Sequence, residues 1–316
     1  MCQNAMRERY VNFYTDFAFK KLFGTEANKE LLVSFLNAMF NGEETICDLR
    51  YLNVEHLGRT LADRKAVFDV YCENAKGEKF LIEMQKAEQE YFKDRSIFYS
   101  TFPIQEQAHK GPWDFRLEKV YTIGILNFTI DDTDPDYMHH EVKLMDTRTH
   151  EVFYDKLCYI YLEMPKFRKT EQELATPLDK WLYAIKNLAT LMEQPEALQG
   201  AVFERLFRQA EIAQFTPQEA YDYRESQKDF WDLYSVTETA ERKGREEGKA
   251  EGLAEGLEKG LSQGREEGLA EGMEKGLSQG KSEGILETAR NFKALGIDAA
   301  TIAKATGLTT EEIERL

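Results

Sequence analysis

The stretch FDVYCENAKGEKFLIEMQ, residues 68–85, decides the fold. Two short runs rich in Val, Phe, Tyr and Ile flank a polar turn, and this arrangement predicts a β-hairpin. A three-residue loop, Ala75-Lys76-Gly77, would place glycine where a type I turn with a G1 bulge requires the left-handed conformation. The sequence therefore predicts both the hairpin and the length of its loop.

The loop fixes the register of the hairpin. Counting back from Asn74 opposite Glu78 places Asp69 directly opposite Glu83. Because side chains alternate along a strand, Asp69, Glu83 and Gln85 are predicted on one face of the sheet. The other face is predicted to carry the apolar side chains Phe68, Val70, Ile82 and Met84.

Two carboxylates opposed across a strand pair repel each other by about 0.2–1 kcal/mol, and by more on a buried face. A hard divalent cation would offset this cost. Mg²⁺ is held by one or two carboxylates, keeps several waters and binds substrate phosphates. The residues alone leave two interpretations open: a metal site for phosphodiester chemistry, or a polar, solvated face of the sheet.

Elements around the hairpin alternate between helices and strands. Two helices are predicted, the first with Thr15 or Asp16 as its N-cap and a break around Gly24, and the second over the apolar positions from Leu31 to Met39. Helical spacing returns in residues 88–111. The near-continuous apolar runs LEKVYTIGILNFTI and DKLCYIYLEMP predict central strands. Residues from 170 to about 240 show only helical patterns.

The hairpin and its flanking motifs resemble a known family. Asp69 in FDVYC and the sequence LIEMQ are similar to the PD-(D/E)XK nuclease core, in the variant where glutamine replaces lysine. The motifs TDFAFKKLFG, EMQKAEQEYFKDRSIFYST and KVYTIGILNF resemble the recombination-promoting nuclease and putative transposase family. The resemblance covers roughly residues 10–240, and the glycine-rich tail is also similar to family members.

This resemblance implies an α/β fold: a restriction-endonuclease-like core with a central mixed sheet flanked by helices, and an all-helical C-terminal extension. It implies a metal-dependent DNA endonuclease linked to recombination or mobile elements. Asp69 and Glu83 would bind Mg²⁺, with Mn²⁺ as a substitute, and Gln85 would be the third catalytic residue. The alternative is a weakly active or inactive DNA-binding or assembly protein of a mobile element or defence system.

Gln85 departs from the commoner lysine. An amide can orient water but brings no positive charge, so a second cation or another basic residue must supply that charge. On an ideal strand Lys86 points to the opposite face, and it could serve only if the strand ends there.

Four further residues are accessory candidates. Asp16 is either an additional metal ligand or the N-cap of its helix. Lys20 either contacts phosphate or is simply solvated. Arg95 and Tyr99, spaced i and i+4 on one helix face, are candidates for binding the DNA backbone.

The chain is expected to divide into four parts. Residues 1–165 form the nuclease core, 166–240 a helical extension, 241–284 a glycine-repeat segment and 285–316 a small helical element. Glycine occupies every fourth position from Gly244 to Gly284, and the block 252–267 recurs at 268–283 with three changes. This repeat is either a flexible spacer or a helix whose glycine surface lets other helices approach. We expect homo-oligomers through this C-terminal region.

Composition narrows the classes of protein. The net charge is −16, with 29 Lys or Arg against 41 Asp or Glu in residues 1–240, which argues against a sequence-independent nucleic-acid coat. No apolar run approaches the length that a membrane span requires, and the four cysteines lack metal-ligand spacing, so we expect a cytoplasmic protein. The segment DDTDPDYMHHE, residues 131–141, is expected to be a solvated loop.

Overall fold

The computed structural model describes residues 8–56, 66–108, 114–130 and 134–316. The chain divides into two compact units, Met1–Glu238 and Thr239–Leu316. Helix α6, Pro217–Ala294, contributes residues to both units. No helix of the described chain is both long and apolar enough to cross a membrane.

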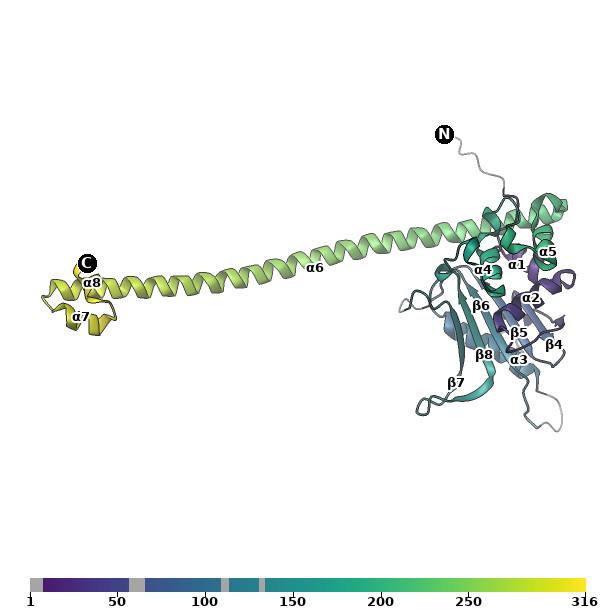
Figure 1. Cartoon of the computed structure of the whole chain (residues 1–316), viewed down its shortest axis with the longest axis horizontal. Helices are drawn as coiled ribbons and strands as arrows, with labels where there is room; N and C mark the ends of the chain where they lie inside the picture. The colour runs from purple at the N-terminus through teal and green to yellow at the C-terminus, as the bar shows by residue number, and fades with distance from the viewer. Residues whose placement is uncertain (1–7, 57–65, 109–113, 131–133) are drawn as a thin grey trace, which may run out of the picture. The chain divides into compact units, whose positions relative to one another are not determined.

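The first unit is built on a six-stranded mixed sheet (Figure 1). Strands β5, β6 and β8 run parallel to one another, and the outer strands are antiparallel to their neighbours. Across the sheet the order is β1 (Leu49–Tyr51), β4 (Val70–Asn74), β5 (Lys79–Gln85), β6 (Val120–Leu126), β8 (Val152–Glu163) and β7 (His139–Met145). A separate short ladder pairs β2 (Glu55–His56) with β3 (Ala66–Val67).

The main hydrophobic core lies on one face of this sheet. Every residue of β6 is buried, as the continuous apolar run predicts for a central parallel strand. Trp181 is fully buried against Phe23 and Phe35. The helices that contribute to this core are α1 (Asp16–Phe23), α2 (Lys29–Phe40), α4 (Pro177–Asn187), α5 (Ala201–Ala210) and the beginning of α6, through Tyr223 and Phe230. Short 3₁₀ turns lie between the elements of this unit, at Glu26–Asn28, Met164–Lys166, Glu171–Glu173, Leu188–Thr190, Glu196–Leu198 and Ile212–Gln214.

Helix α3, Phe92–Glu106, covers the opposite face of the sheet. Two buried hydroxyl pairs attach it to β8: Ser96 Oγ lies 2.7 Å from the Tyr161 hydroxyl, and Ser100 Oγ lies 2.8 Å from the Tyr159 hydroxyl. Because a buried polar group must be paired to avoid a desolvation penalty, these contacts fix both the rotation and the position of α3.

The β4–β5 hairpin has the predicted register. Val70 lies opposite Ile82, the Asn74 N–H donates to the Glu78 carbonyl at 3.1 Å, and Gly77 has a φ of +80°. The three-residue loop with its left-handed glycine is confirmed.

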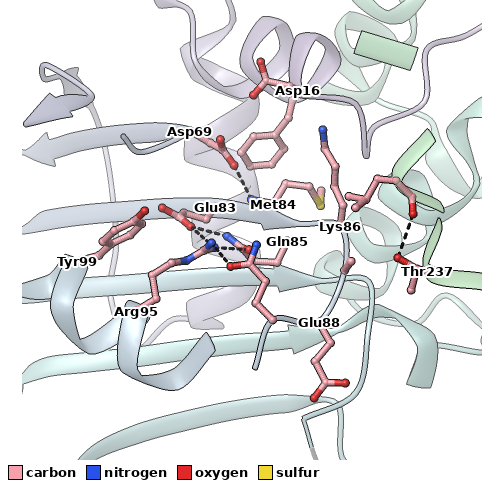
Figure 2. Close-up of a pocket in the computed structure, with 14 residues that line it drawn as sticks. Asp16, Asp69, Glu83, Met84, Gln85, Lys86, Glu88, Arg95, Tyr99 and Thr237 are labelled. Carbon is pink, nitrogen blue, oxygen red and sulfur yellow. Dashed lines mark hydrogen bonds and ion pairs between the residues drawn. The ribbon is translucent and has the colours of Figure 1, made fainter. Parts of the chain in front are cut away.

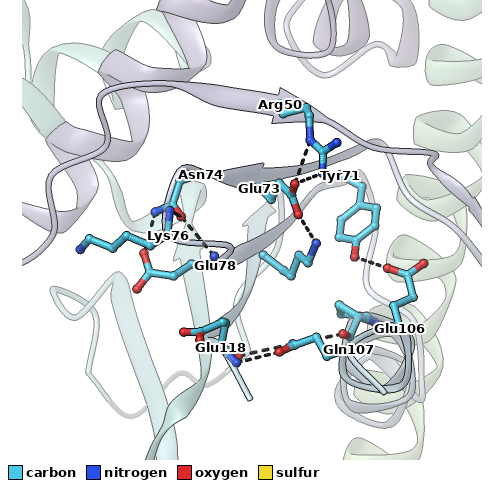
Figure 3. A network of polar contacts seen from close by, with 11 residues as sticks. Arg50, Tyr71, Glu73, Asn74, Lys76, Glu78, Glu106, Gln107 and Glu118 are labelled. Atoms are coloured by element: carbon cyan, nitrogen blue, oxygen red, sulfur yellow. Dashed lines mark hydrogen bonds and ion pairs between the residues drawn. The ribbon is translucent and has the colours of Figure 1, made fainter. Parts of the chain in front are cut away.

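Two polar contacts link β4 and the segment before β6 to α3 (Figure 3). The Tyr71 hydroxyl donates to Glu106 Oε2 at 2.5 Å, and the Glu118 N–H donates to Gln107 Oε1 at 2.7 Å. These bonds join β4 and the segment before β6 to the C-terminal end of α3. The hairpin is therefore held by a side-chain contact with α3 as well as by the backbone hydrogen bonds of the sheet.

The segment 131–141 is not entirely a loop. His139, His140 and Glu141 begin the outer strand β7, whereas residues 131–133 lie outside the described chain. His140 Nε2 lies 3.4 Å from the buried Glu163 carboxylate. The strand was missed because polar residues dominate its beginning, as they often do at a sheet edge.

The second unit contains the C-terminal part of α6 with α7 (Ala299–Thr306) and α8 (Thr310–Arg315). Ala289, Ile302 and Ile313 form its small core. The glycine repeat is helical, and a Cβ atom at any glycine from 244 to 284 would meet nothing within 4 Å in the described chain beyond its own stretch of helix.

Candidate active site

Glu83 and Gln85 lie on the face of β5 that α3 covers. The intervening residues Ile82 and Met84 belong to the main core on the other face, as the predicted alternation requires. Gln85 is the last residue of β5, and its carbonyl accepts a hydrogen bond from the Asn127 N–H at 2.9 Å. A carboxylate and an amide therefore share one face at the end of a buried strand.

Asp69 directly precedes β4, where the β4–β5 ladder stops. The last ladder pair is Val70 opposite Ile82. Beyond it, Asp69 Oδ2 accepts a hydrogen bond from the Met84 N–H at 2.8 Å. A side-chain oxygen thus accepts the hydrogen bond that a backbone carbonyl would accept in a regular ladder. This hydrogen bond holds the Asp69 carboxylate beside β5, the strand that carries Glu83.

The predicted alternation fails at Phe68. This ring is fully buried with Tyr71 and Leu81, on the face opposite Val70. The Phe68 N–H donates to the Val54 carbonyl at 2.9 Å, so its backbone has left the β4–β5 ladder and no longer follows its pleat. The Phe68 ring packs edge to face with the Tyr99 ring, and their centroids lie 5.3 Å apart.

The electrostatics of the two carboxylates are unfavourable without a cation. Burial raises the pKa of Asp69, against the hydrogen bond from Met84. Burial, followed by the charge of Asp69, raises the pKa of Glu83 to about 8, although Arg95 opposes this shift. Glu83 Oε1 is buried and finds no hydrogen-bond partner among the described residues. Both carboxylates would be stabilised as anions by a positive ion between them.

Gln85 is held between an acid and a base (Figure 2). Its Nε2 donates to Glu83 Oε2, and its Oε1 accepts from Arg95 Nη2. Arg95 Nη2 also lies 3.5 Å from Glu83 Oε2, and the guanidinium carbon lies 5.5 Å from the centroid of Tyr99. The structure therefore places a positive charge directly beside the neutral amide.

These residues line a pocket of about 410 Å³. Leu233 and Thr237 of α6 form part of its wall. A larger groove of about 1090 Å³ adjoins it along α1, and the two share Asp16, Asp69 and Lys86. The carboxylates thus lie in a pocket that continues into an open groove.

Lys86 is the first residue after β5, and its side chain extends away from Arg95, to the side on which α1 carries Asp16. Figure 2 shows its side chain extending toward the region between Asp69 and Asp16. Its positive charge is among the influences that lower the pKa of Asp69. The condition under which Lys86 could replace the missing lysine, that the strand ends before it, is met.

Asp16 and Lys20 pair with each other in the groove that adjoins the pocket. Lys20 Nζ lies 2.9 Å from Asp16 Oδ1, and both side chains are almost half exposed. The N-cap of α1 is Thr15, whose hydroxyl accepts from the Ala18 N–H, so Asp16 is not needed as a cap. Its charge contributes to the raised pKa of Asp69.

The donor set fits a hard divalent cation. Within the described ranges, no group of three or more His, Cys, Asp or Glu side chains is arranged to hold a metal ion. Asp69 and Glu83 supply two carboxylates, and Mg²⁺ commonly takes one or two from the protein and the rest from water and phosphate. The unpartnered oxygen of Glu83 offers a ligand atom for such an ion.

Sequence reasoning missed part of the pocket. Gln89 accepts a hydrogen bond from Arg95 Nη1, and the polar run after Gln85 was the available signal for this turn. Leu233 and Thr237 lie far along the chain, and no local pattern distinguishes them from other residues of α6.

A mixed sheet with two carboxylates at the end of its central hairpin defines the class of PD-(D/E)XK nucleases. Residues 13–240 match the family described as PD-(D/E)XK nuclease family transposase, and the chain belongs to this family. Searches of curated proteins and of solved structures found no significant match.

Proposed function

We propose that the protein is a Mg²⁺-dependent DNA endonuclease of a mobile element, with Asp69, Glu83 and Gln85 at its catalytic centre. The observation that carries the proposal is the Glu83 carboxylate, 14% exposed, which has a buried, unpartnered oxygen and a pKa raised by burial and by Asp69. A buried pair of like charges is costly unless a ligand uses it. Membership of the nuclease family supports DNA as the substrate.

Asp69 and Glu83 would hold the ion. Mg²⁺, once bound, would lower the pKa of a water and neutralise charge on a phosphodiester. Asp69 is positioned by the Met84 N–H, and Glu83 by the Gln85 amide. Because each carboxylate is already oriented, little reorganisation is needed before the reaction.

Arg95 and Lys86 would bind the scissile phosphate from two sides. Arg95 contacts Gln85 on the α3 side, and Lys86 lines the pocket beside Asp69. Together they would provide the positive charge that a neutral Gln85 lacks. Tyr99 stacks under Arg95 and would restrict its movement.

Nicking of supercoiled plasmid tests the proposal. The wild-type protein with Mg²⁺ or Mn²⁺ is expected to convert supercoiled plasmid into open circles, whereas EDTA or Asp69→Ala abolishes the conversion. The same gel profile under all conditions would reject the enzyme and favour a DNA-binding or assembly role. Plasmid retardation without nicking would support that second role directly.

The glycine repeat is proposed as a site of self-association. Leu253, Leu257, Leu261, Leu269, Met273 and Leu277 each follow a glycine and are exposed in this helix. A helix with glycine at every fourth position allows close approach of another backbone, and burial of the adjacent apolar side chains would offset the low helix propensity of glycine.

A further inference from the structure

The sheet ends in a long outer strand. Within the described residues β7 is the last strand on its side, with seven residues, whereas the opposite outer strand β1 has three. An outer strand presents a row of backbone N–H and C=O groups that no neighbour pairs, and proteins usually keep such strands short or cover them. The length of β7 therefore needs an explanation.

Apolar side chains cluster on the hairpin that β7 forms with β8. Val142 and Leu144 on β7 are each 47% exposed, and on β8 Val152 is 53% and Phe153 79% exposed. Single exposed apolar residues are ordinary, but several on one hairpin mark a surface that binds another protein. Val142 and Leu144 lie on the same outer strand as the unpaired backbone, and Val152 and Phe153 lie on the strand beside it.

The charges of β7 favour a second copy of the same strand as the partner. A two-fold axis that pairs two antiparallel copies places one residue opposite its own copy. An axis at Val142 sets Glu141 opposite Lys143 of the second copy, and it does so twice. An axis at Glu141 or at Lys143 would instead set like charges opposite each other, which is destabilising.

Glu141 and Lys143 already form an ion pair within one chain. Lys143 Nζ lies 2.6 Å from Glu141 Oε1 on the same strand, with side chains 29% and 42% exposed. Two copies about Val142 would bring four alternating charges together, each near an opposite one. The charge pattern of β7 is therefore complementary to itself.

The irregular end of β7 limits the pairing. Its register with β8 shifts between Lys143 and Leu144 and again between Leu144 and Met145. Bulges of this kind bend an edge away from further strands. About an axis at Val142 only Glu141–Lys143 of the regular part face one another, because His140 and His139 would face Leu144 and Met145 beyond the shifts. The ladder is therefore short and does not favour continued addition of chains.

We propose that β7 is a dimer interface, where it pairs antiparallel with β7 of a second copy about a two-fold axis at Val142. The two six-stranded sheets then form one continuous sheet. Because the ladder is short and the buried area small, dissociation constants on the order of micromolar are expected. The inference does not depend on nuclease activity.

Charge reversal in the full-length chain tests the register. Glu141→Lys and Lys143→Glu each place like charges across the axis, and each is expected to weaken the dimer by roughly tenfold. Mixed one to one, the two variants regain opposite charges, and sedimentation of labelled chains should show a mixed dimer tighter than either variant alone. If the mixture associates no better than the separate variants, the interface is wrong.

Cross-linking locates the axis independently of association through the tail. Val142→Cys, in a background with Cys2 and the exposed Cys47 changed to Ser, should form an intermolecular disulfide because the two copies of residue 142 face each other. Val152→Cys is a control of similar exposure that does not face its own copy. Equal yields at the two positions would overturn the proposed pairing, and melting curves would verify that both variants fold.

Discussion

Asp69 Oδ2 accepts a hydrogen bond from the backbone N–H of Met84 at 2.8 Å, where the β4–β5 ladder ends. The same carboxylate is a proposed metal ligand and completes the hydrogen bonding of the strand next to Glu83. The two roles can be separated, because an asparagine keeps the acceptor oxygen but loses the charge.

Asp69→Asn is expected to lower plasmid nicking by at least about 100-fold, which corresponds to the loss of a few kcal/mol of metal-dependent stabilisation. Its melting temperature without metal should stay close to that of the wild type. Asp69→Ala should lose both activity and about 1–3 kcal/mol of stability, because the Met84 N–H loses its partner. Equal melting temperatures for the two variants would contradict this structural role.

Glu83→Gln should abolish nicking and the rise in melting temperature that Mg²⁺ produces. Without metal it should be as stable as the wild type or slightly more stable, because an amide cannot acquire a negative charge beside Asp69 at this desolvated position. Glu90→Gln, a change at an exposed carboxylate, is the matched control. A Glu83→Gln protein that still cuts DNA and still responds to Mg²⁺ would refute the site.

The raised pKa of Glu83 predicts how stability depends on pH. The folded protein keeps the Glu83 proton up to about pH 8, whereas an unfolded glutamate loses it near its ordinary pKa. Between these values the folded state binds more protons, so Glu83 makes the metal-free protein less stable as pH rises. Denaturant unfolding at pH 5 and pH 8 should show this loss, and Glu83→Gln should reduce it. Mg²⁺ affinity should rise over the same range, because the ion displaces the proton.

Gln85→Lys tests the charge balance of the site. A lysine at this position is usual in PD-(D/E)XK nucleases, and the sequence alone suggests that it would be tolerated. The structure changes this expectation, because Arg95 Nη2 donates to Gln85 Oε1 and would be repelled by an ammonium group. We expect reduced nicking in Gln85→Lys and partial recovery in Gln85→Lys with Arg95→Met, measured at equal protein stability.

Lys86→Ala should reduce nicking about 10–100-fold, while Lys86→Arg keeps part of the rate because the positive charge remains. Lys93→Ala, at an exposed position in the first turn of α3, is the control. DNA binding measured by anisotropy in Ca²⁺ should weaken less than the rate falls. Loss of binding equal to the loss of rate would reduce Lys86 to a general DNA contact.

Alanine at Gly256, Gly260 and Gly264 tests whether another helix packs closely against the glycine repeat or whether the repeat is only a spacer. Each Cβ would meet open space in the single chain, so each change should stabilise the helix by about 1 kcal/mol. If another helix packs against the glycines, the same changes should lower the mass seen by light scattering. A more helical protein of unchanged mass would exclude close packing at these positions.

Much of the hairpin could be predicted because its determinants are local. The left-handed position of Gly77 sets the loop, and the loop sets which residue faces Glu83. The position of Phe68 could not be predicted in this way, because its N–H bonds to Val54 and leaves the ladder. The contact of Arg95 with Gln85 depends on how α3 packs, and sequence spacing does not report that packing.

The hydroxyl pairs of α3 have a consequence for how this protein would respond to random mutation. Arg95 reaches Gln85 from a helix whose rotation is set by Ser96 on Tyr161 and by Ser100 on Tyr159. Loss of a serine hydroxyl would let the helix turn and move the guanidinium while leaving every proposed catalytic residue intact. A genetic screen for inactive variants should therefore recover changes at buried serines and tyrosines that never touch DNA.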